Sequence, residues 1–131
     1  MSDGPGSSAS TELWLVRHGE TEWSRARRHT SVTDLPLTAE GTRVAEQLRE
    51  RLAGEPFERV VTSPRLRARD TARLAGFPEA EVCAELVEWA YGSYEGITTT
   101  DIRQQVPDWT VWTHPIPGGE TAGEVATRLG R

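Results

Sequence analysis

Residues 12–17, Glu-Leu-Trp-Leu-Val-Arg, form a short run of apolar and strand-forming residues that polar residues bound on both sides. Such a run predicts a β-strand over Glu12 to Arg17. His18 and Gly19 follow it directly. In open α/β sheets, ligands bind beyond the carboxyl ends of the strands. The stretch therefore predicts both a strand of the sheet and one wall of a ligand site.

Outward from this run, predicted helices and strands alternate along the chain. The expected elements, in order, are a helix from its cap Thr38 to Gly54, a strand over 58–62, a helix from Ser63 to near Gly76, a short strand over 81–84, a helix over 98–105 and a last helix capped by Thr121. This alternation favours an α/β sandwich with a largely parallel sheet.

The length of 131 residues suits one domain with a self-supporting core. We expect residues 1–10, which are small and polar, to form a disordered leader and residues 11–131 to form the domain. No apolar run approaches the ~18 residues of a membrane span, and no signal peptide is visible. The single cysteine, Cys83, excludes an internal disulfide, so the expected location is the cytoplasm.

The charge pattern favours a small anionic ligand over nucleic acid. Twenty acidic residues outnumber fifteen basic ones, all of them arginine, and the formal net charge is −5. A net-acidic protein lacks the phosphate neutralisation on which duplex affinity largely depends. Arginines nevertheless cluster over residues 17–28 and 59–73, and such clusters fit a small anion. Solvated helix faces account for most of the individual arginines.

Three segments carry residues suited to phosphate chemistry. Arg17 offers guanidinium donors beside His18, and its charge disfavours imidazolium, which keeps the ring neutral and nucleophilic near pH 7. Arg67 lies in the first turn of a predicted helix, where free amides and the helix dipole also attract anions. Apolar neighbours over residues 86–91 are expected to raise the pKa of Glu88 toward that of a general acid. Taken singly, the ordinary alternatives are a structural histidine, a surface helix and an exposed glutamate.

Four motifs follow one another along the chain. They are Arg17-His18-Gly19-Glu20-Thr21; Ser63 with Arg67-Ala68 and Thr71-Ala72; Glu88 with Tyr91-Gly92 and Glu95-Gly96; and Pro117-Gly118-Gly119-Glu120-Thr121. Together they resemble the histidine phosphatase superfamily, also called phosphoglycerate mutase-like, from residue 12 to the end. The strings over 62–71 and 88–96 look closest to the branch of sedoheptulose-bisphosphatase-like and acid phosphatases. The resemblance implies a three-layer α/β/α sandwich with a mostly parallel sheet.

The resemblance also implies a role for each matched residue. His18 would attack phosphorus and become a phosphohistidine, while Arg17 and Arg67 would hold the equatorial oxygens. Glu88 would protonate the leaving alcohol and then take a proton from the water that cleaves the phosphoenzyme. This chemistry needs no metal and no cofactor. The substrate-binding residues that the resemblance implies are Ser24, Thr30 and Tyr91.

Two features depart from the family pattern. Ser31 stands where related sequences usually carry glycine, so the loop backbone differs if a positive φ is needed there. The sequence also stops before the family's second His-Gly motif, and neither His29 nor His114 follows an apolar strand that would let it substitute. Either the chain is truncated, or it is a natural short form that is weakly active or inactive. Loss of a central strand exposes neighbouring strand edges, so we also expect self-association.

The predicted function is hydrolysis of small phosphate monoesters, sugar phosphates among them. The alternative within the enzyme class is phosphoryl transfer of the phosphoglycerate mutase type. Residues 96–117 disfavour it, because they leave little room for the insertions that mutases use. The alternative from another class is a catalytically impaired protein that binds phosphate or a partner protein. The expected partners are a small phosphorylated substrate and a second copy of the chain, with neither nucleic acid nor membrane.

Overall fold

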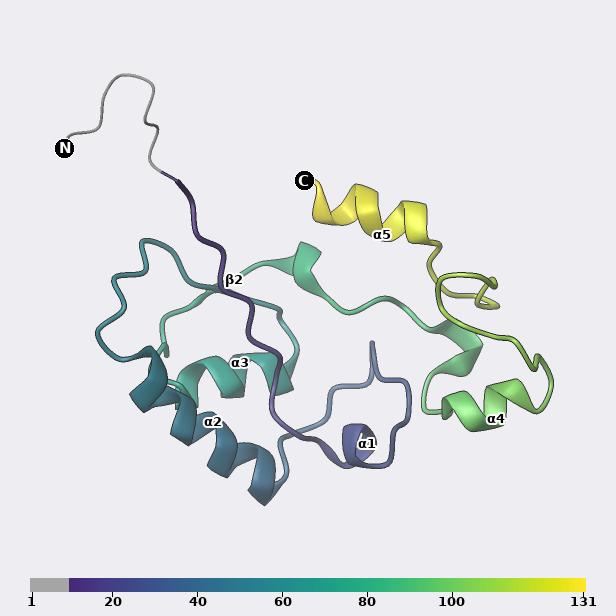
Figure 1. Cartoon of the computed structure of the whole chain (residues 1–131), viewed down its shortest axis with the longest axis horizontal. Helices are drawn as coiled ribbons and strands as arrows, with labels where there is room; N and C mark the ends of the chain where they lie inside the picture. The colour runs from purple at the N-terminus through teal and green to yellow at the C-terminus, as the bar shows by residue number, and fades with distance from the viewer. Residues whose placement is uncertain (1–9) are drawn as a thin grey trace.

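The computed structural model describes residues 10–131 and has mixed α/β architecture (Figure 1). The elements, grouped by type, are helices α1 (Glu22–Arg25), α2 (Ala39–Leu52), α3 (Leu66–Leu74), α4 (Thr99–Arg103) and α5 (Ala122–Leu129), 3-10 helices η1 (Ala84–Leu86) and η2 (Gly92–Tyr94), and strands β1 (Val61–Thr62) and β2 (Glu81–Val82). The strands pair in parallel, with Val61 opposite Glu81 and Thr62 opposite Val82. The α/β class and the parallel sheet are therefore confirmed.

Threonine caps fix where most of the helices begin. The hydroxyl of Thr38 accepts a hydrogen bond from Gly41 N at the start of α2, and Thr121 caps α5 in the same way. Thr21 and Thr98 cap α1 and α4. A short side-chain oxygen at this position satisfies an amide that the helix itself leaves without a partner. The predicted caps at Thr38 and Thr121 are confirmed.

Helix α3 begins later than the sequence predicts. Ser63 was the expected start, but the cap residue is Arg65, whose side chain makes no capping bond. Instead, Asp34 reaches the helix from an earlier loop, and its Oδ1 accepts a hydrogen bond of 2.7 Å from Leu66 N. Ser63 Oγ accepts from Arg65 N at 3.2 Å. A carboxylate far away in the sequence thus does the capping, because the first helical amides are satisfied by whichever acceptor the tertiary structure brings to them.

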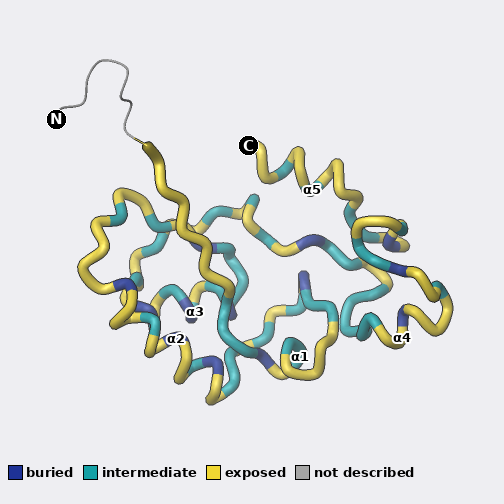
Figure 2. Tube along the Cα trace, viewed as in Figure 1, coloured by how far each residue is buried: buried dark blue, intermediate teal, exposed yellow. Residues whose placement is uncertain are grey.

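The predicted strand over Glu12 to Arg17 is wrong as a strand. Within residues 10–131, the only sheet is the pair β1 and β2, and no strand includes this segment. It runs as an elongated and mostly exposed trace toward α1 (Figures 1 and 2), with Leu15 85% exposed. A strand exists only where a neighbour satisfies its amides and carbonyls, so an apolar run without that neighbour stays a single extended chain.

The other predicted strands exist but are shorter, since β1 and β2 have two residues each in place of 58–62 and 81–84. Residues 1–9 of the predicted leader lie outside the described residues, and Ser10 is exposed. None of the helices over residues 10–131 is long and apolar enough to cross a membrane.

Apolar packing is divided between two regions of the chain. One cluster brings together Trp89, Ile102, Trp109 and Ile116, so it ties the segment around η2 to α4 and the loop after it. The other region lies between α2 and α3, where Ala45 of α2 and Ala75 after α3 are almost fully buried. Burial of apolar surface stabilises both regions. The first includes Trp89, next to Glu88, and the second includes α3, which carries Arg67.

Candidate functional site

Two glycines allow the chain after His18 to cross the start of α2 at backbone contact distance. A Cβ atom on Gly19 would lie 2.8 Å from Gly41 O, and a Cβ atom on Gly41 would lie 2.7 Å from Glu20 N. No real Cβ atom tolerates such distances, so both positions require glycine for space. The crossing therefore holds the segment directly after His18 against the start of α2.

Helix α3 holds the same segment from another side. Thr71 Oγ1 accepts a hydrogen bond of 2.9 Å from Gly19 N and donates one of 2.7 Å to Arg67 O. Thr71 is buried, so neither bond competes with water. One hydroxyl therefore connects the residue after His18 to the backbone of Arg67.

The His18 ring is half-buried, and a local hydrogen bond determines its tautomer. Its Nδ1 lies 2.7 Å from Gly19 O. Because a carbonyl oxygen only accepts, this bond requires the hydrogen on Nδ1 and leaves the lone pair on Nε2. A lone pair on the outer nitrogen is what an attacking histidine needs.

Burial and charge together keep the His18 ring neutral. Burial is the largest effect on the pKa of His18 and lowers it below 6.5; the bond to Gly19 O works in the opposite direction. The charges of Arg67 and Arg17 lower this pKa further, and the charge of Glu88 raises it. The charges that act on the pKa of His18 thus come from three of the segments that the sequence singles out.

Arg67 is the buried cation of the site, with 2% of its surface exposed. Its Nη1 donates to Thr33 O at 2.8 Å and its Nη2 donates to Ser31 O at 3.1 Å. Burial, followed by the neighbouring charge of Arg65, lowers the pKa of Arg67. Guanidinium remains charged in proteins, so the site contains a fixed positive charge.

Ser31 accommodates its departure from glycine without an unusual backbone. Among the non-glycine residues of the described part, only Arg27 has a positive φ, of 62°. Ser31 is buried, and its hydroxyl donates a hydrogen bond of 2.5 Å to Glu95 Oε1. Ser31 therefore does not adopt a left-handed backbone conformation, and the expected difference in the loop backbone does not arise in that way.

Glu88 is exposed, so the expectation that apolar neighbours enclose it is wrong. The buried member of this segment is Trp89, whose indole Nε1 donates to Glu120 O at 2.8 Å. Adjacent side chains in an extended segment point to opposite sides, so burying Trp89 turns Glu88 outward. The carboxylate of Glu88 accepts a hydrogen bond of 2.7 Å from Trp89 N.

An ion pair near the end of the chain anchors the segment that carries Glu88. Arg128 donates to the carbonyl oxygens of Glu85 and Val87 at 2.7 and 2.8 Å, and it pairs with Glu120 at 2.8 Å. The carboxylate of Glu120 also accepts from Ala90 N at 2.8 Å. The hydrogen bond from Arg128 is the main reason that the pKa of Glu120 is lowered. The sequence motifs do not include Arg128. Its only signal in the sequence is its place in the helix that directly follows the fourth motif.

Tyr91 lies among the charges of the site. Burial is the main cause that raises the pKa of Tyr91 to about 12, and the charges of Glu88 and Glu95 raise it further, while Arg17 and Arg67 work in the opposite direction. Its phenol is therefore neutral at physiological pH. Contact between Tyr91 and the substrate stays a prediction.

The two short polar residues already have local partners. Ser24 Oγ accepts from Thr21 N at 2.9 Å and donates to Thr21 O at 3.1 Å, which completes the capping of α1. Thr30 Oγ1 donates to Arg28 O at 3.1 Å. Their phosphate contacts also stay predictions. The side chain of Arg17 is exposed.

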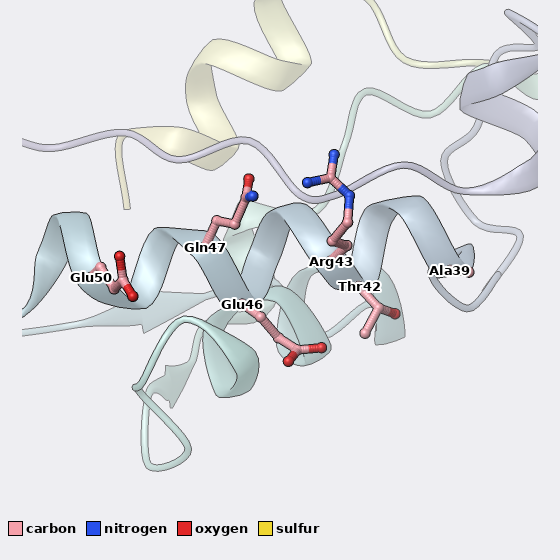
Figure 3. Close-up of a pocket in the computed structure, with 6 residues that line it drawn as sticks. All are labelled: Ala39, Thr42, Arg43, Glu46, Gln47 and Glu50. Atoms are coloured by element: carbon pink, nitrogen blue, oxygen red, sulfur yellow. The ribbon is translucent and has the colours of Figure 1, made fainter.

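Hollows also form on the described surface away from these residues. One hollow runs along the outer side of α2, and Figure 3 shows its side chains pointing to different sides of the helix instead of converging. Another lies near the end of α2 and includes Leu52 and Phe77. Over residues 10–131, no group of three or more histidine, cysteine and acidic side chains is arranged to hold a metal ion.

Comparison with known proteins gives a consistent result. The family model described as "Histidine phosphatase superfamily (branch 1)" matches residues 13–131. An acid phosphatase from Mycobacterium tuberculosis is 50% identical over 121 residues, which are 88% of this chain and 58% of the relative. A sedoheptulose 1,7-bisphosphatase from Saccharomyces cerevisiae is 35% identical over 141 residues, with 89% of this chain and 52% of the relative covered.

A solved structure from Mycobacterium tuberculosis superposes with a TM-score of 0.81 at 47% identity and covers 86% of this chain and 60% of that one. The chain thus spans between about half and three-fifths of the length of the proteins it matches.

Proposed function

The chain belongs to the histidine phosphatase superfamily, branch 1, and on that premise we propose that it hydrolyses small phosphate monoesters, sugar phosphates among them, through a phosphohistidine on His18. The observation that carries the proposal is the neutral His18 ring with its lone pair on Nε2, on which Arg17, Arg67 and Glu88 act. The names of two relatives, acid phosphatase and sedoheptulose 1,7-bisphosphatase, support this substrate class.

In the first step, the lone pair of His18 Nε2 attacks phosphorus and forms a P–N bond. The bond between phosphorus and the ester oxygen breaks, and the oxygen leaves with its electron pair and takes a proton from Glu88. Arg67, which is already oriented by the 31–33 loop, and Arg17 stabilise the charge on the equatorial oxygens.

In the second step, water returns the enzyme to its starting state. The Glu88 carboxylate takes a proton from a water molecule whose oxygen attacks phosphorus. The P–N bond breaks and its electron pair returns to His18 Nε2, so the products are orthophosphate and a neutral imidazole. The charge of Glu88 acts on the pKa of His18, which supports this role, and its exposure leaves the carboxyl group open to water.

Trapping the covalent intermediate tests the proposal. The chain is mixed with p-nitrophenyl phosphate, quenched in alkaline denaturant and mapped by mass spectrometry, since a phosphohistidine survives base and is lost in acid. We expect the phosphate on His18. A phosphate on His29 or His114, or turnover with no trapped phosphate, would falsify the mechanism.

A mutase remains the second candidate because the phosphohistidine is common to both reactions. The packing of Ile102, Trp109 and Ile116 into the core supports hydrolysis, since it leaves residues 96–117 compact. With 3-phosphoglycerate, we expect release of inorganic phosphate and glycerate. Conversion to 2-phosphoglycerate would instead show that the chain is a mutase.

The pH dependence of kcat/KM follows from the lowered pKa of His18. The neutral ring is the reactive form, and burial with the charges of Arg67 and Arg17 holds its pKa below 6.5. Activity is therefore retained as the pH falls to 6.5 and lost only as it falls through the lowered pKa. A profile of kcat/KM against pH checks this, and an acidic limb above pH 6.5 would contradict it.

We also propose a cytoplasmic location, with neither nucleic acid nor membrane as partner. The formal net charge of −5 and the single cysteine support this. Self-association stays a prediction, supported by the exposed apolar side chains of residues 13–16.

A further inference from the structure

The loop over residues 31–33 is held between two opposite charges. On one side, the carboxylate of Glu95 accepts hydrogen bonds from Ser31 N at 2.9 Å and from Thr33 N at 3.0 Å. On the other side, Arg67 donates to the carbonyl oxygens of the same two residues. The loop amides therefore face an anion and its carbonyls face a cation, so hydrogen bonds through the loop backbone connect Glu95 to Arg67.

The hydroxyl of Ser31 adds a third connection. It donates to Glu95 Oε1 at 2.5 Å and accepts from Tyr91 N at 3.2 Å. Ser31 is 2% exposed, so water does not replace these bonds. Tyr91 lies three residues after Glu88. One buried hydroxyl thus joins the loop that orients Arg67 to the segment that carries Glu88, and a glycine at this position has no atom with which to do so.

We propose that Glu95 and Ser31 are positioning residues that hold Arg67 in the orientation needed to bind a phosphoryl group. The inference rests on the proposed function, because it names what supports the phosphate-binding cation of that same site. Two guanidinium N–H groups of Arg67 donate to the loop, and in the proposed complex the remaining ones donate to the phosphate oxygens. Neither positioning residue needs to touch the substrate.

The chemistry of Glu95 explains why a carboxylate is required. Burial works to raise the pKa of Glu95, but hydrogen bonds from Ser31 and Thr33 outweigh it and hold the pKa below its usual value. A glutamine at the same position presents an NH2 group where one of these donors needs an acceptor. Glu95→Gln therefore preserves the size of the side chain and breaks the connection to the loop.

Binding of inorganic phosphate, measured by isothermal titration calorimetry on the whole chain, tests the inference without requiring turnover. We expect Glu95→Gln to weaken phosphate binding by about 10- to 100-fold, the effect of one or two lost bonds to a charged group. Ser31→Ala keeps the bonds from the loop amides and is expected to weaken binding by roughly 3- to 10-fold. The matched control is Ser93→Ala, an exposed serine whose hydroxyl donates to Pro117 O, and it should leave the affinity unchanged.

A double-mutant cycle with Arg67 separates positioning from a general structural role. If Glu95 acts through Arg67, Glu95→Gln adds little further loss to the phosphate affinity of Arg67→Ala. Equal losses with and without Arg67 would overturn the inference, as would an unchanged phosphate affinity in Glu95→Gln. Should Glu95→Gln fail to fold, as judged by circular dichroism, Ser31→Ala takes its place in the cycle. A wild-type chain that binds phosphate and shows these losses but hydrolyses no ester would refute the proposed function and leave this inference intact.

Discussion

Replacing His18 by alanine removes the hydrolysis of p-nitrophenyl phosphate, with an expected loss in kcat of about 10⁴- to 10⁶-fold. The size of the loss follows from the chemistry, because no other group of the proposed site can accept the phosphoryl group. Steady-state release of p-nitrophenol measures it. Circular dichroism should show an unchanged fold, since the His18 ring is only half-buried and, within residues 10–131, its side chain hydrogen-bonds to the adjacent Gly19 O.

His114→Ala is the matched control for this experiment. His114 is also partly exposed, and its Nδ1 contacts the hydroxyl of the neighbouring Thr113 at 2.7 Å. It follows none of the predicted strands, and its loss should change kcat less than about twofold, as expected for a surface substitution. Turnover that survives in His18→Ala at the wild-type rate would remove His18 from the mechanism.

Replacing Gly41 by alanine should destabilise the protein by about 3 kcal/mol, near the upper end of what overpacking a filled site costs. A Cβ atom there would lie 2.7 Å from Glu20 N. Neither backbone can move away easily, because Thr38 N also donates to Glu20 O at 2.8 Å. Denaturant unfolding measures the change. The helix must separate from the segment after His18, so we expect kcat to fall as well.

Gly123→Ala is a matched control, because Gly123 also lies in the first turn of a helix, α5. Its Cβ atom would meet nothing nearer than Thr121 Oγ1 at 3.9 Å. Alanine is the better helix former, so this substitution should stabilise the protein by up to about 1 kcal/mol. If both substitutions have the same effect on stability, the close crossing at Gly41 is not a constraint.

The candidate site residues can be proposed from the sequence because each of them carries a local signal. A histidine after an apolar run and an arginine in the first turn of a helix are visible in the sequence, and the charges of Arg67 and Glu88 do act on His18. The caps Thr38 and Thr121 are local too, since each hydroxyl bonds an amide three residues ahead.

The errors have a common physical cause, which is dependence on distant partners. The run over Glu12 to Arg17 has the composition of a strand, but a strand also needs a neighbour, and composition does not supply one. Ser63 has the right chemistry for a cap, yet Asp34 occupies that role. In the sequence, Glu95 is recognisable only as part of the third motif, with Glu88 and Tyr91-Gly92. Its function for the loop depends on Ser31 and Thr33, more than sixty residues earlier in the chain.

The hydrogen bond from Leu66 N to Asp34 Oδ1 has a consequence for how a ligand enters. This bond holds Asp34, and the bonds to Glu95 hold Ser31 and Thr33, so the loop is already fixed before phosphate binds. The conformational entropy of this loop is thus lost during folding and not during association. Phosphate should therefore bind in a single kinetic phase with little change in heat capacity, as a small anion entering a rigid receptor.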